Sequence, residues 1–386
     1  MNTESPNTVS SRAMPSNTMS PNTDHTSSNT LKVGILLPTR EAAIRGNFSV
    51  APLLDLAQRV EELGFDSLWA GDSLFARPRL DPLIVLAACA GATRRVTLGT
   101  AALTAALRHP LIGVNMLTSL EHAAPGRLRI GVGSGFPVPE SEHEFGSVGI
   151  PFARRTARLD ETVRLWKRVW ACGSATDPAA VRNLADYQGT LWAADSLDRL
   201  PGPATPGGPG VWLAAGATPR VLSRVAKFYD GWLPFLPDPA EYRAAWDRIR
   251  EFADEAGRPA GAIEPGLYAT VYVDGDRARA EARLEEYVQG YYGRSLEFMS
   301  AIQAYGHGSP EQCAHWLAGF VEAGARQLVL RIGALDPVGQ LDLIARELLP
   351  VLREATAKTT AAAALPTSSA PPASALEPAP AGSIHA

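Results

Sequence analysis

Cysteine is scarce in this 386-residue sequence, and the three that occur lie far apart. Cys89, Cys172 and Cys313 lack the paired spacing of a zinc site or a redox dithiol, so we interpret them as buried or incidental thiols in a reducing compartment. No apolar stretch reaches the roughly 20 residues that span a bilayer, and the N-terminal segment lacks the basic and apolar regions of a secretory signal. We therefore expect a cytoplasmic protein without a membrane partner.

An excess of positive charge is also missing, because 36 Lys and Arg stand against 40 Asp and Glu, for a formal net charge of -4. Such a chain has no basic excess to neutralise the phosphates of a nucleic acid. The histidines are scattered, and we identify no metal site. Hydrophobic residues make up 46% of the sequence, enough for a large core. We expect a globular protein whose partner is a small-molecule substrate.

The two ends differ in composition from the middle of the chain. Residues 1–30 are rich in Ser, Asn, Thr and Pro and contain no Leu, Ile, Phe, Trp or Tyr, and residues 356–386 form an Ala-, Pro-, Ser- and Thr-rich tract. Segments of this composition bury too little apolar surface to order themselves. We predict two disordered tails around a single domain over residues 31–355.

Between the tails, short apolar runs alternate with longer stretches of helical periodicity, the pattern of βα units around a buried parallel sheet. The predicted strands cover residues 32–38, 65–72, 96–104, 127–133, 211–216, 231–235, 267–274 and 327–333. The predicted helices include residues 82–93, 111–123, 156–170, 219–228, 240–256 and 311–323. Eight strands without an antiparallel hairpin signal favour a closed (β/α)₈ barrel over a doubly wound sheet.

Two segments are longer than ordinary loops. Residues 134–155 follow the fourth predicted strand, and residues 171–210 precede the fifth. Insertions of this length are often functional, so we interpret both as candidate lids or substrate loops.

Barrels of this kind carry their catalytic groups at the carboxyl ends of the strands. The run Gly131 to Gly135 follows the fourth predicted strand, and its glycines allow backbone N–H groups to approach an anion closely. It is either a phosphate-binding turn or an ordinary tight turn. It is not the dinucleotide-binding fingerprint, because Phe136 stands where a third glycine is needed.

A helix is predicted to begin at Pro219, directly after the fifth strand, with Thr218 as its N-cap. The small residues Ala215 to Ala217 leave the first N–H groups of that helix accessible, and such a terminus attracts phosphate. An ordinary capped helix start has the same sequence, but the position at the end of a late barrel strand favours a phosphate site.

Two side chains near other strand ends have competing interpretations. Asp72 could accept a hydrogen bond from the N–H of a bound ring, and Asp is equally common in turns and caps. His109 could act as an acid or base near neutral pH, or could only cap the helix that Pro110 begins.

Four segments, taken in order, resemble one protein family. They are residues 64–72, 96–100, 108–110 and 126–135. With these motifs the chain resembles the bacterial-luciferase-like superfamily of flavin- or deazaflavin-dependent oxidoreductases over about residues 31–350. The resemblance implies a (β/α)₈ barrel with an insertion, a phosphorylated flavin-like cofactor at the strand ends, and a homodimer.

The resemblance also implies roles for individual positions. Asp72 is expected near the cofactor ring, and Thr104 is a further candidate beside it. The segment Thr100-Ala101-Ala102 is expected to back the ring, in many relatives through a non-proline cis peptide. The residues expected to touch the cofactor chain are Gly133 and Ser134, and those expected to receive its phosphate are Gly216 and Ala217.

The sequence departs from the family pattern in places that bear on chemistry. Ser73 stands where many relatives have a histidine, so an acid–base role is not expected there. Phe136, Pro137 and Pro139 replace an acid and an amide of the sugar-phosphate-oxidising deazaflavin relatives, so we do not expect that substrate class. Apolar residues near the expected ring position suggest an apolar substrate pocket, although each could be core: Trp69, Phe75, Phe136, Trp212, Trp232 and Phe235.

Three functions remain open. The leading hypothesis is a monooxygenase that uses reduced FMN and O₂ on a small, largely apolar substrate, with a separate flavin reductase as a partner and His109 as the candidate acid or base. The first alternative is hydride transfer with coenzyme F420. The second is a non-catalytic flavin-binding barrel, which the serine after Asp72 would fit.

Overall fold

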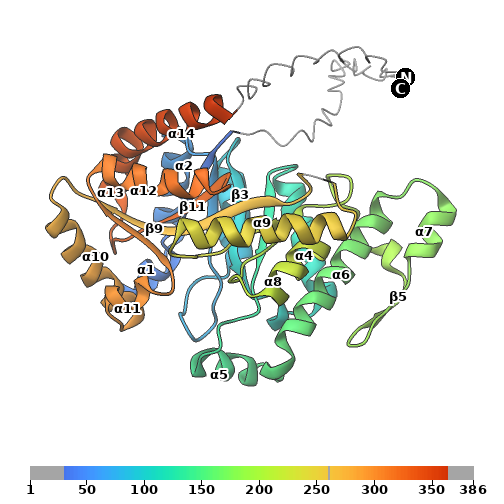
Figure 1. The fold of residues 1–386 in the computed structure, drawn as a ribbon. Coiled ribbons are helices and arrows are strands. Elements are labelled where there is room, and N and C mark those ends of the chain that lie inside the picture. The colour runs from blue at the N-terminus through green and yellow to red at the C-terminus, as the bar shows by residue number, and fades with distance from the viewer. Residues whose placement is uncertain (1–29, 260, 364–386) are drawn as a thin grey trace, which may run out of the picture.

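The computed structural model describes residues 30–259 and 261–363, and this part of the chain is built around a closed parallel barrel (Figure 1). Its eight strands, in barrel order, are β1 (Lys32–Leu36), β2 (Ser67–Ala70), β3 (Thr97–Leu103), β4 (Leu128–Val132), β7 (Gly210–Leu213), β8 (Gly231–Trp232), β9 (Glu264–Val273) and β11 (Gln327–Ile332). Each strand pairs in parallel with the next, and β11 pairs back onto β1. The predicted (β/α)₈ barrel is confirmed.

The helices predicted from the sequence are present with small shifts at their ends. They are α3 (Pro82–Ala92), α4 (Pro110–Ala123), α6 (Arg155–Ser174), α8 (Pro219–Phe228), α9 (Pro239–Glu255) and α12 (Pro310–Glu322). Side-chain caps fix several of their starts: the Asp81 carboxylate accepts from the Leu83 and Ile84 N–H groups at the start of α3. Capping satisfies N–H groups that have no partner inside the helix.

Further elements were not predicted. The helices among them are α1 (Thr39–Ile44), α2 (Ala51–Glu62), α10 (Arg277–Tyr292), α11 (Leu296–Ser300), α13 (Val338–Leu343) and α14 (Leu349–Ala363), and β10 (Ala304–Gly308) extends the sheet in parallel from β9. The shorter turns are a 3₁₀ turn at Ala105–Leu107 and a π turn at Ile344–Leu348. Helix α2 is the exception among them, because the spacing of Leu53, Leu56, Val60 and Gly64 predicts a helix that ends at Gly64, and the structure has it.

Helix α14 continues past residue 355, the predicted end of the domain. Thr356 is only 5% exposed, and its hydroxyl donates to the Leu352 carbonyl. The boundary drawn from composition is therefore too early, because an alanine-rich stretch also favours helix. The rest of the predicted tails lies outside the described residues.

Two tryptophans fill the inside of the barrel. Trp69 of β2 and Trp212 of β7 are 0% and 1% exposed, and their ring centroids lie 5.6 Å apart. A Cβ at Gly99 would come within 2.3 Å of Trp69, and one at Gly231 within 2.5 Å of Trp212. Glycine on the neighbouring strands thus makes room for each ring.

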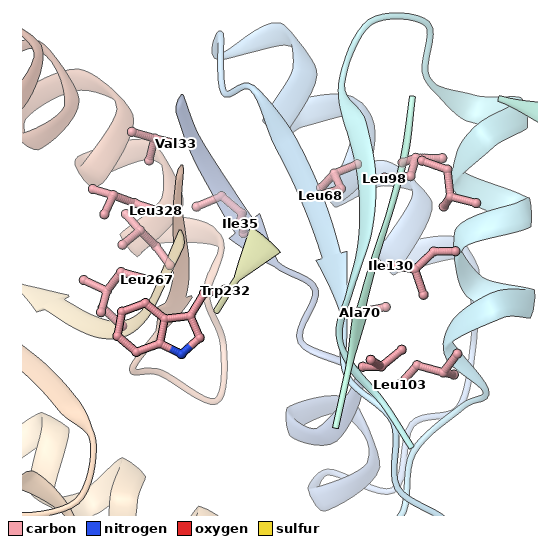
Figure 2. Packing of buried hydrophobic residues seen from close by; sticks show 14 of the residues in the cluster. Val33, Ile35, Leu68, Ala70, Leu98, Leu103, Ile130, Trp232, Leu267 and Leu328 are labelled. Atoms are coloured by element: carbon pink, nitrogen blue, oxygen red, sulfur yellow. The ribbon is translucent and has the colours of Figure 1, made fainter. Parts of the chain in front are cut away.

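A third tryptophan of the predicted apolar pocket is also core. Trp232 is 0% exposed and packs 5.2 Å from the ring of Tyr242 on α9. Figure 2 shows it among the buried aliphatic side chains of the strands, including Ile35 and Leu267. The pocket interpretation of Trp69, Trp212 and Trp232 is therefore wrong, because all three stabilise the barrel itself.

The first insertion, residues 134–155, folds onto the carboxyl-terminal side of the barrel. It contains α5 (Pro139–Ser147) and a 3₁₀ turn at Phe152–Arg154, and it leads into α6. In Figure 1, α5 lies at the opposite end of the molecule from α14. This segment remains a candidate cover for the strand ends.

The second insertion, residues 171–210, lies elsewhere. It contains α7 (Pro178–Leu184), the antiparallel pair β5 (Tyr187–Gln188) and β6 (Ala193–Ala194), and a 3₁₀ turn at Leu197–Arg199. Glu161 of α6 accepts from the Leu191 and Trp192 N–H groups, and Glu121 of α4 accepts from Thr205 N–H. The insertion packs on the outer helices (Figure 1), so it is not the lid that its length suggested.

Candidate functional site at the barrel mouth

Small residues form a continuous floor at the carboxyl ends of the strands. A Cβ at Gly133 would lie 3.5 Å from the Ala102 Cβ and 3.8 Å from the Ala214 carbonyl, and one at Gly71 would lie 3.5 Å from the Ala101 carbonyl. These five residues therefore adjoin one another across four neighbouring strand ends, β2, β3, β4 and β7. A floor of small residues lets a flat ring approach the backbone closely, except at Gly71, where a Cβ would lie 2.3 Å from the Arg79 guanidinium.

The peptide bond between Ala101 and Ala102 is cis, as the family resemblance implied. The neighbouring threonines serve the framework. The Thr100 hydroxyl donates to the Gly131 carbonyl at 2.8 Å, and the Thr104 N–H donates to Asp72 at 2.9 Å. Thr100 therefore contributes its backbone to the floor, and its buried side chain ties β3 to β4.

Asp72 is held by an arginine that the sequence interpretation did not single out. Both carboxylate oxygens of Asp72 accept from Arg108, at 2.6 and 3.2 Å, and Arg108 also donates to Asp81 at 2.7 Å. The side chains of Arg108 and Asp72 are 18% and 9% exposed, so water screens this pair only in part. The Asp72 carboxylate is thus held in place beside the floor.

The structure corrects the interpretation of His109. Its Nδ1 accepts from the Leu111 N–H at 3.3 Å as the N-cap of α4, and its ring packs edge-on against Trp192 of the second insertion, 5.1 Å away. The side chain is exposed and contacts no residue of the floor. Of the two interpretations of His109, the helix cap describes its contacts, and its neighbour Arg108 is the residue that reaches the mouth.

At the end of β4, Gly133 N–H donates to the Leu103 carbonyl at 2.9 Å, which leaves its Cα on the open side of the floor. Ser134 is partly exposed, and its hydroxyl has no hydrogen-bond partner in the described part of the chain. Phe136 and Phe235 pack together at 5.5 Å, with Phe136 40% exposed. Together with Phe75, which is 50% exposed, they are the members of the expected apolar pocket that reach the surface.

The predicted helix start after the fifth barrel strand is present. Thr218 caps α8 by accepting from the Val221 N–H, and Pro219 is its first residue. A Cβ at Gly216 would meet nothing within 4 Å, so there is open space beside this terminus. Arg220, in the first turn of α8, is exposed and has no partner among the described residues. N–H groups, the helix dipole and this cation all suit a phosphate at Gly216 and Ala217.

The first insertion is fastened to the loop after β2 by a buried carboxylate. Glu144 of α5 is 4% exposed and accepts from the Leu74 N–H, from the Phe75 N–H at 2.8 Å and from the Ser73 hydroxyl at 3.2 Å. The Ser73 hydroxyl therefore has a structural role, since it donates to Glu144. Residues 134–155 are therefore a fixed wall of the mouth.

A buried cation lies at the end of the last barrel strand. Arg331 of β11 is 1% exposed and donates to the hydroxyls of Tyr292 at 2.6 Å, Tyr305 at 2.9 Å and Thr270 at 2.9 Å. Its Cζ lies between 4.8 and 5.7 Å from the ring centroids of Tyr268, Tyr287, Tyr291, Tyr292 and Tyr305. Tyrosine oxygens and ring faces stabilise this arginine, since it has no ion pair within the residues described.

The arginine changes the acidity of one tyrosine. Burial alone would raise the pKa of Tyr292, but the charge of Arg331, its hydrogen bond and the nearby charge of Arg77 together lower that pKa below its ordinary value. Burial raises the pKa of Tyr305 above its usual range. Tyr292 is therefore the tyrosine of this cluster that most readily gives up its proton.

Arg331 and Glu144 carry sequence signals of different strength. Arg331 is a charged residue inside an otherwise apolar predicted strand, and buried charges are rare without a function or a partner. Glu144 could not be identified from its own segment, because its partners lie about seventy residues earlier. Neither was predicted as a site residue.

The chain is a closed (β/α)₈ barrel with a floor of small residues and a helix N-terminus at the carboxyl ends of its strands, the place where barrel enzymes carry their sites and often bind phosphate. The family model described as luciferase-like monooxygenase matches residues 31–327. The chain belongs to this luciferase-like family of oxidoreductases.

Curated relatives and solved structures agree with the family. An F420-dependent glucose-6-phosphate dehydrogenase of Kineococcus radiotolerans is 30% identical over 244 residues, covering 60% of this chain and 67% of that protein. One of Beutenbergia cavernae is 29% identical over 333 residues, covering 79% and 94%. The monooxygenase RslO1 of Streptomyces bottropensis superposes with a TM-score of 0.67 at 22% identity, covering 83% and 99%. An F420-dependent secondary alcohol dehydrogenase superposes with a TM-score of 0.67 at 18% identity, covering 84% and 99%.

None of the helices described is both long and apolar enough to span a bilayer. Across residues 30–259 and 261–363, no group of three or more His, Cys, Asp or Glu side chains is arranged to hold a metal ion.

Proposed function

We propose that this protein is an F420-dependent oxidoreductase that moves a hydride between the cofactor and a polar organic substrate. The observation that carries the proposal is the chemistry of the barrel mouth. One half is the floor of small residues from Gly71 to Ala214, and the other half holds Arg331 and its tyrosines. The sequence had favoured a monooxygenase because of an apolar pocket, and three of that pocket's six members are barrel core.

The curated relatives support the same choice, since F420-dependent enzymes are among the most similar of them. F420 and FMN both carry a flat tricyclic ring and a phosphate, so the floor and the α8 terminus suit either cofactor. The proposal of F420 over FMN therefore depends on the relatives and on the polar mouth together. The departures at Phe136, Pro137 and Pro139 still speak against a sugar phosphate as the substrate.

The residues present fit such a cofactor. The floor residues would hold its ring, Asp72 would lie beside the ring with its charge fixed by Arg108, and Gly216 and Ala217 would receive its phosphate. When bound, F420 would supply a two-electron hydride acceptor or donor. The chain's own residues would bind and orient the cofactor, and α5 would exclude water from one side of the mouth.

Oxidation of an alcohol also releases the hydroxyl proton, which a side chain has to accept. Tyr292 fits this role because it faces the mouth, its pKa is lowered, and Arg331 stabilises its anion through a 2.6 Å hydrogen bond. In the reverse direction the same hydroxyl would return the proton. His109 does not fit the role, because its nitrogen caps α4.

A second candidate is the FMN-dependent monooxygenase. It is favoured by the fixed wall that Glu144 makes from residues 134–155, because a reactive oxygen adduct requires exclusion of water. A flavin reductase would then be a partner.

The two candidates are separated by turnover with and without oxygen. Under argon, purified protein would be mixed with F420 and a panel of secondary alcohols and hydroxy acids, and the loss of the F420 absorbance followed. The proposal expects oxygen-independent reduction of F420 by at least one compound. Turnover that occurs only with reduced FMN and O₂, with a matching consumption of oxygen, would contradict it and support the monooxygenase.

A further inference from the structure

A cavity of about 280 Å³ opens at the barrel mouth, on the side away from α8. It is bounded by the turn after β1, the loop after β2, the start of α5 and the last turn of α10. Its lining residues are Arg40, Ala76, Arg77, Val138, Glu140, Gln289, Gly290, Tyr291, Tyr292 and Gly293. Apart from the effect of Arg77 on the pKa of Tyr292, the roles described above do not use the arginines of this cavity.

Arg40 and Arg77 line the cavity and Arg79 lies near them, and within the described residues none of the three forms an ion pair with a carboxylate. Arg77 stacks on the Tyr292 ring at 4.7 Å, and its guanidinium makes no hydrogen bond within the described residues. Arg79, behind the cavity wall, donates to the Tyr291 hydroxyl at 3.0 Å and to a main-chain carbonyl. Arg40 makes one long contact, 3.5 Å, to the Pro78 carbonyl. Clustered cations without counter-ions repel one another.

Arg40 has an unsatisfied donor as well. Its Nε is buried and has no hydrogen-bond partner in the described part of the molecule. Burial is the largest cause that lowers the pKa of Arg40; Tyr291 and Glu41 raise it in part, and the charges of Arg79 and Arg77 lower it further. A buried donor left without an acceptor is destabilising, so an acceptor supplied from outside would bind there favourably.

The negative charges nearby are too few or already engaged. Glu41 is buried and accepts from the Tyr287 hydroxyl at 2.5 Å. Glu140 lines the cavity from an exposed position. The carboxyl end of α10 contributes only about half a negative charge. The positive charges of Arg40, Arg77 and Arg79 outnumber these negative charges, so the region of the cavity has a net positive charge.

The position of the cavity relates it to the cofactor. In the ring of eight strands, β1 stands four strands away from β7, so helix α1, which follows β1 and carries Arg40, lies across the mouth from Gly216. A cofactor with its phosphate at the start of α8 and its ring on the floor would direct the ring, and not the phosphate, toward the cavity.

We propose that this cavity binds an anionic group, a carboxylate or a phosphate, of the substrate, held by Arg40 and Arg77. The assignment to substrate rests on the proposed function, whereas the anion site itself does not. It replaces the largely apolar substrate expected from the sequence with one that has a negatively charged end.

The test is calorimetric titration of the purified full-length protein with inorganic phosphate. The variants are Arg40→Gln, Arg77→Gln and the double variant. Arg182→Gln, which removes an exposed charge on α7, is the control for net charge, and Gly216→Val blocks the other candidate phosphate site. A thermal melt of each variant establishes that it is folded.

Besides any phosphate that Gly216→Val removes from the start of α8, we expect one phosphate whose affinity Arg182→Gln and Gly216→Val leave unchanged and each cavity substitution weakens about tenfold. Equal affinity in the double variant would overturn the anion site, as would a loss confined to Gly216→Val. Displacement of this phosphate by saturating F420 would overturn the substrate assignment, because the cofactor itself would then fill the cavity. Failure of F420 to bind the wild-type protein would contradict the proposed function and leave the phosphate result standing.

Discussion

The ion pair of Asp72 and Arg108 shows how one residue determines the state of its neighbour. Asp72 was identified from its position at a strand end, but its charge is set by a side chain 36 residues later. Since both groups are largely buried, removal of one leaves the other uncompensated. His109, which follows Arg108, was the acid or base candidate identified from the sequence, and in the structure it caps α4.

We predict that Arg108→Met destabilises the protein by about 2 kcal/mol, because the pair is partly buried and Asp72 loses its counter-ion. The free energy of unfolding is measured by urea denaturation. Adding Asp72→Asn should recover part of the loss, since the unpaired charge is then gone. If the double variant is no more stable than Arg108→Met alone, the two side chains are not coupled.

Tyr292 should determine part of the pH dependence of the reaction. As a proton acceptor it has to be deprotonated, so kcat/KM for alcohol oxidation should rise with pH through a pKa below the ordinary tyrosine value. Tyr292→Phe should lower kcat and abolish this rise. A uniform decrease at every pH would instead indicate that the hydroxyl only supports Arg331.

The buried thiols provide a test of the core. Burial raises the pKa of Cys89 and of Cys313 to about 12, and Cys172 is buried as well. The reactive thiolate is therefore almost absent from the native protein at pH 8. A thiol reagent should label the three cysteines only as fast as the protein unfolds, and rapid labelling of any of them would contradict its buried position.

At the scale of elements, one carboxylate ties α5 to the loop after β2. Glu144 satisfies two backbone N–H groups and the Ser73 hydroxyl, which would otherwise be partly buried donors. Sequence-based reasoning predicted a lid here from loop length alone. It predicted the same for residues 171–210, which pack on α4 and α6, because length does not say which surface a loop covers.

Glu144→Ala should destabilise the protein by about 1–3 kcal/mol, since its donors lose their acceptor. Glu144→Gln is the matched control, because its amide oxygen keeps an acceptor in place. Limited proteolysis should cut the loop after β2 and residues 134–155 faster in the alanine variant only. Equal protection of both variants would show that other contacts hold α5.

At the scale of the whole molecule, the barrel was predictable because buried parallel strands and amphipathic helices produce regular patterns. Gly216 and Asp72 were predictable because strand ends mark the mouth. The roles of Trp69, Trp212 and Trp232 were not, since an apolar side chain at a strand end can face the core or the pocket. Arg331 and its tyrosines come from strands and helices far apart in sequence, and only the fold brings them together.

The homodimer stays a prediction, and exposed apolar side chains show where to test it. Ile84 and Ile112 are each 62% exposed, in the first turns of the neighbouring helices α3 and α4. Apolar side chains that cluster on a surface favour association. Light scattering should show a dimer that Ile84→Glu with Ile112→Glu converts to a monomer, and an unchanged mass would place the interface elsewhere or exclude it.

The central claim, an F420 site across the barrel mouth, is tested most directly by anaerobic titration of the protein with F420, FMN and reduced FMN, followed by fluorescence. Gly216→Val and the control Gly91→Val, on the exposed face of α3, are titrated in parallel. We predict tightest binding of F420, weakened at least tenfold by Gly216→Val and unchanged by Gly91→Val. Preference for reduced FMN, or binding that Gly216→Val does not alter, would contradict the account.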